Sequence, residues 1–405
     1  MKLSAGVIDA GASSLATFLA ALVAARTLTA AEMGAYALVF AAWTLATQVP
    51  SQLIYASAEA KLVSVDPGLR SAHLAANLRH SLPWSAVALL CVLGVMFLIP
   101  SDVPMTSAVN LSITGAVAAV LAPAQEHARQ LLHLDGANWS AAWVSVARVI
   151  LVGVGLASAV WWGVPVTLAP LGALAVADGL CLLAVVIMAR PRGSVPVVYD
   201  ARRLLEIGSW LLVSAMASPV AGFVVNLVLA QTVSSSSLGI ADKARIAAQP
   251  ILVLGVGLSA VLRAGSMRAA LDLDRKVADT LNRRFQILMA ASVAVVLLIS
   301  ITPTPFNVIE MVIPDAFVEP GLMQLSVLAA AANAWVMLRR HEVIALGDTR
   351  RVAVIEGWSS LARLPVALAA RALQSWVVPA AFLAGGLVRA IGFARVPFRR
   401  PTAAG

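Results

Sequence analysis

Residues 18–36 read FLAALVAARTLTAAEMGAY, which is the end of an apolar helix, a short polar step and a glycine that opens a second apolar helix. A similar segment, FVVNLVLAQTVSSSSLGIA, occupies residues 223–241 and aligns without a gap at a constant offset of 205. A repeat about half a chain apart is typical of internally duplicated membrane proteins. We therefore predict two related halves, 1–200 and 201–405. The identical pairs include Phe18 and Phe223, Leu22 and Leu227, Val23 and Val228, Thr27 and Thr232, and Gly34 and Gly239.

The composition predicts a membrane protein. Of the 405 residues, 60% are hydrophobic and only 12% are charged, which is about half the charged share of soluble domains. The apolar residues fall in runs of roughly 18–25, long enough to cross about 30 Å of hydrocarbon as helices. We predict an all-α polytopic protein with about twelve spans in two six-helix bundles. The predicted spans are roughly 5–25, 34–58, 82–100, 104–125, 140–161, 165–189, 207–231, 239–262, 285–303, 317–338, 352–373 and 376–394.

Basic residues alternate with these spans. With the N-terminus inside, most of the 29 lysines and arginines fall in cytoplasmic segments, as the positive-inside rule requires. The alternation predicts an even number of spans and both termini in the cytoplasm. We interpret the first span as a real helix and not as a signal peptide, because its counterpart lies in the middle of the chain. The net charge of +9 predicts contact with anionic membrane lipids and no nucleic-acid partner.

The chain has few features of an enzyme or a pump. It contains no GxxxxGK[ST] motif, which argues against ATP hydrolysis. Cys91 and Cys181 are solitary residues within spans, so we interpret them as small core residues and expect neither a disulfide nor a metal site. We place all histidines in cytoplasmic loops or at their edges, and we expect no catalytic triad and no cofactor. The histidines are His73, His80, His127, His133 and His341.

Ionisable residues inside the spans are the most informative feature. Charge at membrane depth is costly, so such residues normally face a protein interior or a water-filled path. We predict that Arg148 and Arg363 bind an anionic substrate such as a pyrophosphate-linked lipid, because guanidinium groups match phosphate oxygens in two-point contacts. Further candidates for substrate binding are Lys243, Arg245 and Arg26. The candidates for ion coupling through protonation are Asp9, Asp178 and Asp242.

Two structural alternatives remain open for these charges. Arg148 could form a salt bridge between helices, for instance with Asp178. The group at residues 242–245 lies near the outer end of its span, where long side chains can extend to water.

The segment ARTLTAAEMGAYALVFAAWTLATQVPSQL, residues 25–53, resembles the start of the Wzx-type polysaccharide flippases of the MOP (multidrug/oligosaccharidyl-lipid/polysaccharide) superfamily. Their first loop typically reads A-R-x-L-x-x-x-x-[FMY]-G-x-Y, followed by an apolar helix. In the second half, LVLAQTVSSSSLGIADKARI resembles the same pattern at Gly239, Ala244 and Arg245. The matching residues of the first half are Ala25, Arg26, Leu28, Met33, Gly34 and Tyr36.

The resemblance implies two six-helix bundles around a V-shaped central cavity, as in MATE and MOP proteins. It implies a flippase that moves polyprenyl-pyrophosphate-linked oligosaccharides across a bacterial cytoplasmic (inner) membrane by alternating access, working beside polysaccharide polymerase and export proteins. A small-molecule or drug antiporter of the same superfamily is the main alternative. A membrane polysaccharide polymerase or ligase is disfavoured, because the large outer loop that carries catalytic residues in such enzymes is missing.

Overall fold

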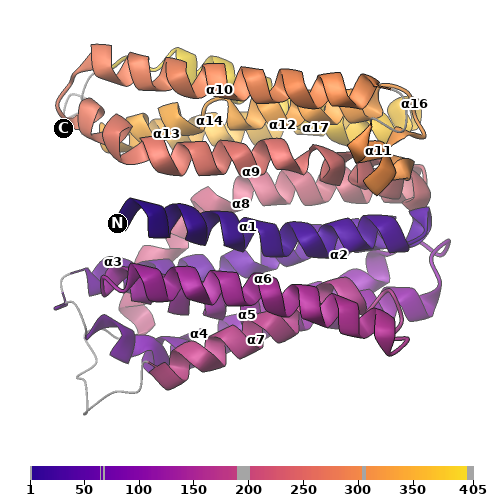
Figure 1. Ribbon diagram of the computed structural model, residues 1–405, viewed down its shortest axis with the longest axis horizontal. Coiled ribbons are helices and arrows are strands. Elements are labelled where there is room, and N and C mark those ends of the chain that lie inside the picture. Colours follow the sequence, from indigo (N-terminus) through magenta and orange to yellow (C-terminus); the bar gives the residue numbers. More distant parts are fainter. Residues whose placement is uncertain (1, 64, 67–68, 189–200, 303–306, 399–405) are drawn as a thin grey trace. The chain divides into compact units, whose positions relative to one another are not determined.

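A computed structural model of the chain describes residues 2–63, 65–66, 69–188, 201–302 and 307–398. The predicted boundary between the halves, after residue 200, borders the stretch 189–200, which lies outside the described residues. In the described residues every regular element is a helix (Figure 1). The all-α class predicted from the sequence is therefore confirmed.

The chain divides into two compact units, Met1–Phe223 and Val224–Gly405. The first contains α1 (Lys2–Thr27), α2 (Ala30–Pro50), η1 (Ser51–Ala56), α3 (Ser57–Leu62), η2 (Arg70–His73), α4 (Leu74–Gly94), η3 (Val95–Leu98), α5 (Met105–Leu134), α6 (Asn138–Trp161), α7 (Ala169–Met188) and most of α8 (Ala201–Thr232). The second contains α9 (Ser235–Leu271), α10 (Arg275–Ile301), α11 (Val308–Val312), η4 (Pro314–Phe317), α12 (Leu322–Ala334), α13 (Met337–Ala345), α14 (Thr349–Leu361), α15 (Arg363–Leu368), α16 (Ala370–Leu373), η5 (Gln374–Trp376) and α17 (Val377–Ala394).

The described residues contain ten helices that are long and apolar enough to cross a membrane. An eleventh is counted if α9, which bends by 49° beside residue 260, forms one span. The predicted span at 352–373 corresponds to α14, α15 and α16, three short helices in succession. Glu356, Arg363 and Pro365 lie within this stretch, and both charge and proline weaken a continuous apolar helix. The chain is a multi-pass membrane protein.

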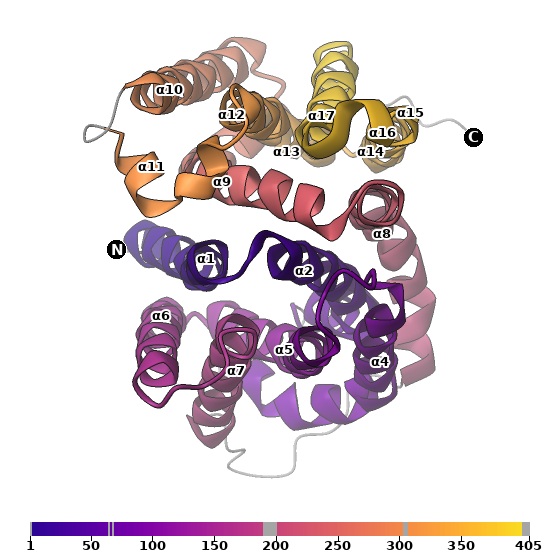
Figure 2. The same ribbon diagram turned by 90° about the vertical axis from the view of Figure 1, so that its right-hand side faces the viewer.

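In the first unit α5 packs against α2, α4 and α7, and α1 packs along α6 (Figure 2). Small residues allow these close approaches. A Cβ atom on Gly115 of α5 would lie 2.5 Å from Cγ1 of Val39 on α2. Along α1, Ala16, Ala20 and Ala24 recur at every fourth position and are fully buried. The alanine-rich composition therefore serves tight helix packing.

In the second unit α12 packs against α9, α10 and α17, and α14 packs on α17 (Figure 2). Gly386 of α17 faces α12, because a Cβ atom there would lie 2.8 Å from Cβ of Ala332. The backbones of the two helices can approach this closely only without that side chain.

The offset of the sequence repeat recurs in the helix ends. α1 ends at Thr27 and α8 ends at Thr232, and each threonine hydroxyl donates to the carbonyl four residues earlier, at 2.8 and 2.7 Å. The next helices begin after Thr29 and Ser234, whose hydroxyl oxygens each accept a hydrogen bond from the backbone three residues later. Both caps satisfy amide groups that a helix start leaves without a partner.

Candidate functional site

Arg148 and Asp178 form a buried ion pair between α6 and α7. Nε of Arg148 lies 2.5 Å from Oδ1 of Asp178, and Nη2 lies 3.2 Å from Oδ2. Nη1 also donates to the backbone carbonyl of Ser13 on α1, at 3.3 Å. The side chain of Asp178 is fully buried, and that of Arg148 is 7% exposed. The salt bridge that the sequence left open as an alternative is therefore present, and it joins a predicted substrate cation to a predicted coupling acid.

Asp9 is the centre of a second buried network. Its Oδ1 accepts a hydrogen bond from the hydroxyl of Ser145 on α6, at 2.6 Å. Its Oδ2 pairs with Arg129 of α5 and lies 2.9 Å from Nε2 of His133 on the same helix. Arg129 also pairs with Glu126 one turn earlier. Histidine is the side chain whose charge changes near neutral pH, and here it faces the Asp9 carboxylate. The coupling role of Asp9 stays a prediction.

The position of Arg129 and His133 corrects the sequence interpretation. We predicted a span that ends near residue 125 and a cytoplasmic loop beyond it, whereas α5 continues to Leu134. Arg129 is only 6% exposed. The hydropathy pattern placed the end of this helix too early, because polar side chains can continue a helix when they pair inside the protein. The i, i+3 spacing of Glu126 and Arg129, typical of a helix, was the available signal.

His127 belongs to a third polar cluster, which the sequence did not predict. Its Nδ1 lies 2.8 Å from a carboxylate oxygen of Glu59, and its Nε2 lies 2.9 Å from the amide nitrogen of Asn77. The imidazole stacks on Tyr55, with ring centroids 4.5 Å apart. His127 lies in α5, two residues beyond the predicted end of that span at 125, and is 1% exposed. His73, the last residue of η2, is also buried, at 3% exposure.

In the second unit Arg363 is the largest of the fully buried side chains, at 1% exposure. Its guanidinium carbon lies 4.6 Å from the centroid of the Phe382 ring on α17, within cation–π range. Gly385, also on α17, makes room for it, because a Cβ atom there would lie 2.6 Å from Nε of Arg363. A buried arginine therefore depends on a glycine of the facing helix.

Arg389 connects α17 to two neighbouring helices. Its Nη2 lies 2.6 Å from a carboxylate oxygen of Glu356 on α14, and its Nη1 donates to the amide oxygen of Asn333 on α12 at 3.2 Å. The other carboxylate oxygen of Glu356 lies 3.4 Å from Arg340. This network holds α12, α14 and α17 together and places a carboxylate between two arginines.

The remaining predicted residues lie near the joints between the first two helices of each repeat. Lys243 of α9 is 2% exposed, and its Nζ lies 2.5 Å from Asp315 of η4. Arg245 lies 2.5 Å from Asp242, one turn earlier on α9. Arg26 is exposed in the last turn of α1, where the helix dipole favours a cation. The structure thus gives each of these cations a local structural partner or role.

Comparison with known proteins identifies the fold. No protein-family model matches the chain, and no curated protein sequence matches it significantly. An inward-facing multidrug resistance MATE family transporter of the MOP superfamily matches with a TM-score of 0.71 at 12% identity, over 96% of this chain and 92% of that one. A eukaryotic MATE transporter matches with a TM-score of 0.67 at 12% identity, over 98% and 96% of the two chains. The chain has the MATE transporter fold.

An outward-facing MATE transporter of the MOP superfamily also matches, with a TM-score of 0.62 at 14% identity, over 97% of this chain and 94% of that one.

Within the MATE fold, the predicted residues of this chain separate into distinct clusters. The first unit brings Arg148 and Asp178 together and keeps Asp9 in a network of its own. The second unit places Arg363 on α15 and the predicted residues at 242–245 near the start of α9.

Proposed function

We propose that this protein is a membrane transporter of the MOP superfamily that moves a polyprenyl-pyrophosphate-linked oligosaccharide to the outer leaflet by alternating access. The observation that carries the proposal is the flippase-like segment at residues 25–53, which lies at the α1–α2 junction of a chain with the MATE fold. The equivalent junction, between α8 and α9, repeats the same helix end and cap. The similar MATE transporters have been solved in inward-facing and outward-facing conformations, which are the two states that alternating access requires.

The buried ion pair offers a mechanism for coupling. While Asp178 is ionised, it occupies the guanidinium of Arg148 in a two-point contact. Uptake of a proton by Asp178 removes the negative charge and releases the guanidinium for a diphosphate, which presents the same two-point geometry. Loss of that proton restores the pair and expels the anion. One proton and one phosphate group would thus bind together and leave together.

A drug antiporter of the same fold is the second candidate. The balance of buried charge supports it, because Arg148, Arg129 and Lys243 each pair with a carboxylate. A cation that is already neutralised by a carboxylate attracts a diphosphate less strongly. One of the solved proteins with this fold is a multidrug resistance transporter.

The deciding experiment measures lipid in cells that lack the gene. We expect the complete lipid-linked oligosaccharide to accumulate in the inner leaflet of the cytoplasmic membrane, and wild-type protein to restore its export. Arg148→Met should not restore export, whereas Arg202→Gln should, because Arg202 is an exposed residue whose side chain is 90% accessible. Unchanged lipid together with a raised sensitivity to organic cations would instead identify an antiporter. Lipid that reaches the outer leaflet but stays unpolymerised would identify an enzyme of polymerisation.

A further inference from the structure

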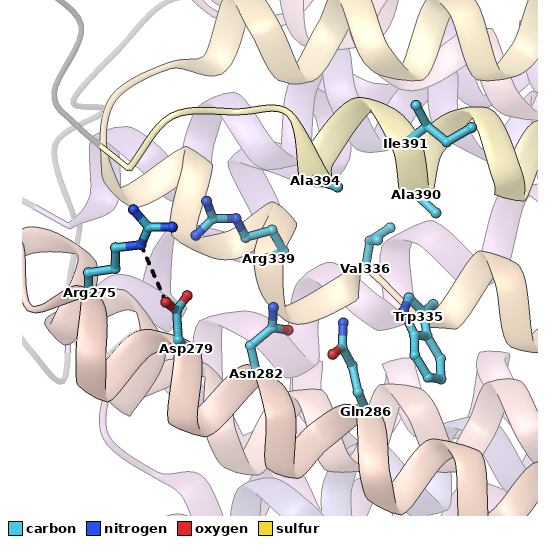
Figure 3. Close-up of a pocket in the computed structure, with 10 residues that line it drawn as sticks. All are labelled: Arg275, Asp279, Asn282, Gln286, Trp335, Val336, Arg339, Ala390, Ile391 and Ala394. Atoms are coloured by element: carbon cyan, nitrogen blue, oxygen red, sulfur yellow. Dashed lines mark hydrogen bonds and ion pairs between the residues drawn. The ribbon is translucent and has the colours of Figure 1, made fainter.

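A pocket of about 470 Å³ lies within the second unit, between α10, the α12–α13 junction and α17 (Figure 3). It contains none of the residues predicted for substrate or ion binding. Arg275, Asp279, Asn282 and Gln286 line it from α10, and Arg339 extends from α13 on the opposite side. Ala394 of α17 contributes only a methyl group to the wall, and so leaves the space open.

The two arginines of the pocket differ in how firmly they are held. Arg275 lies 3.4 Å from Asp279, and their side chains are 76% and 59% exposed, so this surface pair is weak and can open for another anion. Arg339 is fixed, because its Nη1 lies 2.6 Å from buried Glu342 and its Nη2 donates to the carbonyl of Val396 at 3.0 Å. A phosphate between them would meet one fixed and one adaptable guanidinium.

The surroundings of the pocket are positively charged. Residues 275–286 read RKVADTLNRRFQ, which contains four basic residues and one acidic residue. The positive-inside interpretation places this end of α10 at the cytoplasmic face, where the inner leaflet carries anionic lipids. Basic pockets between membrane helices on that side are suited to anionic headgroups.

The side-chain amide of Asn282 indicates which other group, besides a phosphate, the ligand carries. The side-chain amide oxygen of Asn282 is buried and accepts no hydrogen bond from the described residues. A flip of the side-chain amide would turn this acceptor toward the pocket, where it favours a ligand with a hydroxyl donor. Ile391 lines the pocket and is 51% exposed, and Ile287 of α10 is 57% exposed. These apolar surfaces suit acyl chains, and the tryptophan at 335 in the pocket wall is typical of a membrane interface.

We propose that this pocket binds an anionic phospholipid with a hydroxyl-bearing headgroup, of the phosphatidylglycerol type, from the inner leaflet. The phosphate lies between Arg275 and Arg339, a headgroup hydroxyl donates to Asn282, and an acyl chain follows Ile391. This lipid is a resident ligand of the second unit and not the transported cargo. Its binding therefore does not depend on whether the protein is a flippase or an antiporter.

The test measures lipid binding to the full-length protein after delipidation, with native mass spectrometry used to titrate phosphatidylglycerol and phosphatidylcholine separately. We expect preferential binding of phosphatidylglycerol. Arg275→Gln should weaken it about fivefold, equivalent to the ~1 kcal/mol of one basic residue near an anionic surface. Ala394→Trp should abolish the preference by filling the pocket without changing charge. Arg284→Gln is the matched control, because Arg284 is an exposed arginine of the same helix that does not line the pocket.

Equal binding of both lipids, or equal loss in Arg275→Gln and Arg284→Gln, would overturn the proposal, because the attraction would then come from general surface charge. Soluble glycerol phosphate tests the source of the headgroup. If it binds as tightly as the lipid and displaces it, the pocket is a site for a soluble anion and the lipid assignment fails. Asn282→Leu should reduce the preference for phosphatidylglycerol over phosphatidic acid, which lacks the headgroup hydroxyls.

Discussion

Arg148 and Asp178 share two hydrogen bonds across the α6–α7 contact, while the same guanidinium reaches the backbone of α1 at Ser13. Three helices of the first unit thus meet at one buried ion pair. At this depth neither charge has water to replace its partner, and removal of one partner leaves the other uncompensated. The pair is therefore both a structural joint and the most direct place to test coupling.

We predict that Arg148→Met and Asp178→Leu each destabilise the protein by about 3–5 kcal/mol, whereas the double variant recovers most of that loss, because both buried charges are then removed together. Thermal unfolding in detergent measures the difference. Arg202→Gln, at an exposed pair of α8, should change stability by less than ~1 kcal/mol. If the double variant is as unstable as the sum of the singles, the two side chains do not act as a pair.

The contact between Gly385 and Arg363 leads to a second prediction. Gly385→Ala would place a Cβ atom 2.6 Å from Nε of Arg363 and 2.9 Å from the carbonyl of Ser359. We expect a loss of about 1–3 kcal/mol from this overpacking. Gly257→Ala is the control, because no atom lies within 4 Å of the added Cβ and alanine favours a helix. Equal stability of the two variants would show that Arg363 moves aside without cost.

The equivalent helix caps should respond unequally to the same substitution. Thr29 takes part in a reciprocal capping box with Glu32, whereas the Ser234 hydroxyl accepts from the backbone of Ser237 and donates to its hydroxyl, with no acidic residue of the described chain returning a bond to the cap. We expect Thr29→Ala to cost about 1–2 kcal/mol and Ser234→Ala about 0.5–1 kcal/mol. Hydrogen exchange in the first turns of α2 and α9 measures this. If Ser234→Ala increases exchange at the start of α9 more than Thr29→Ala does at the start of α2, the capping box at Thr29 is not the stronger cap.

Asp9 tests the coupling network of the first unit. Asp9→Asn removes the charge that pairs with Arg129 and faces His133, but it keeps a hydrogen-bond acceptor for Ser145. We expect transport driven by a pH gradient to fall to the rate without a gradient, while exchange of substrate without a gradient persists. Proteoliposomes with an imposed gradient measure both rates. Ser145→Ala, which keeps the charge, is the control, and an unchanged gradient response in Asp9→Asn would remove Asp9 from the coupling path.

Several features of the fold could be read directly from the chain. Apolar runs identified the helices, because a segment that crosses the membrane must satisfy its backbone hydrogen bonds within itself, and a helix does so. The repeated segment placed the joints between α1 and α2 and between α8 and α9, where local capping chemistry acts over only a few residues. Their threonine and serine caps occupy equivalent positions in the structure. Such features depend on neighbours in sequence, so sequence alone determines them.

The partners of the buried charges are decided by tertiary structure. Periodicity places Arg148 on a face of α6, but only the packing of α6 against α7 and α1 determines that this face meets Asp178 and Ser13. In the same way, polar residues at the end of α5 resembled a loop until their partners on α1 and α3 were in place. Hydropathy measures the cost of exposing a charge to lipid. It does not measure the pairing inside a bundle that removes this cost, because that pairing joins residues on different helices, 30 positions apart for Arg148 and Asp178 and 120 for Asp9 and Arg129.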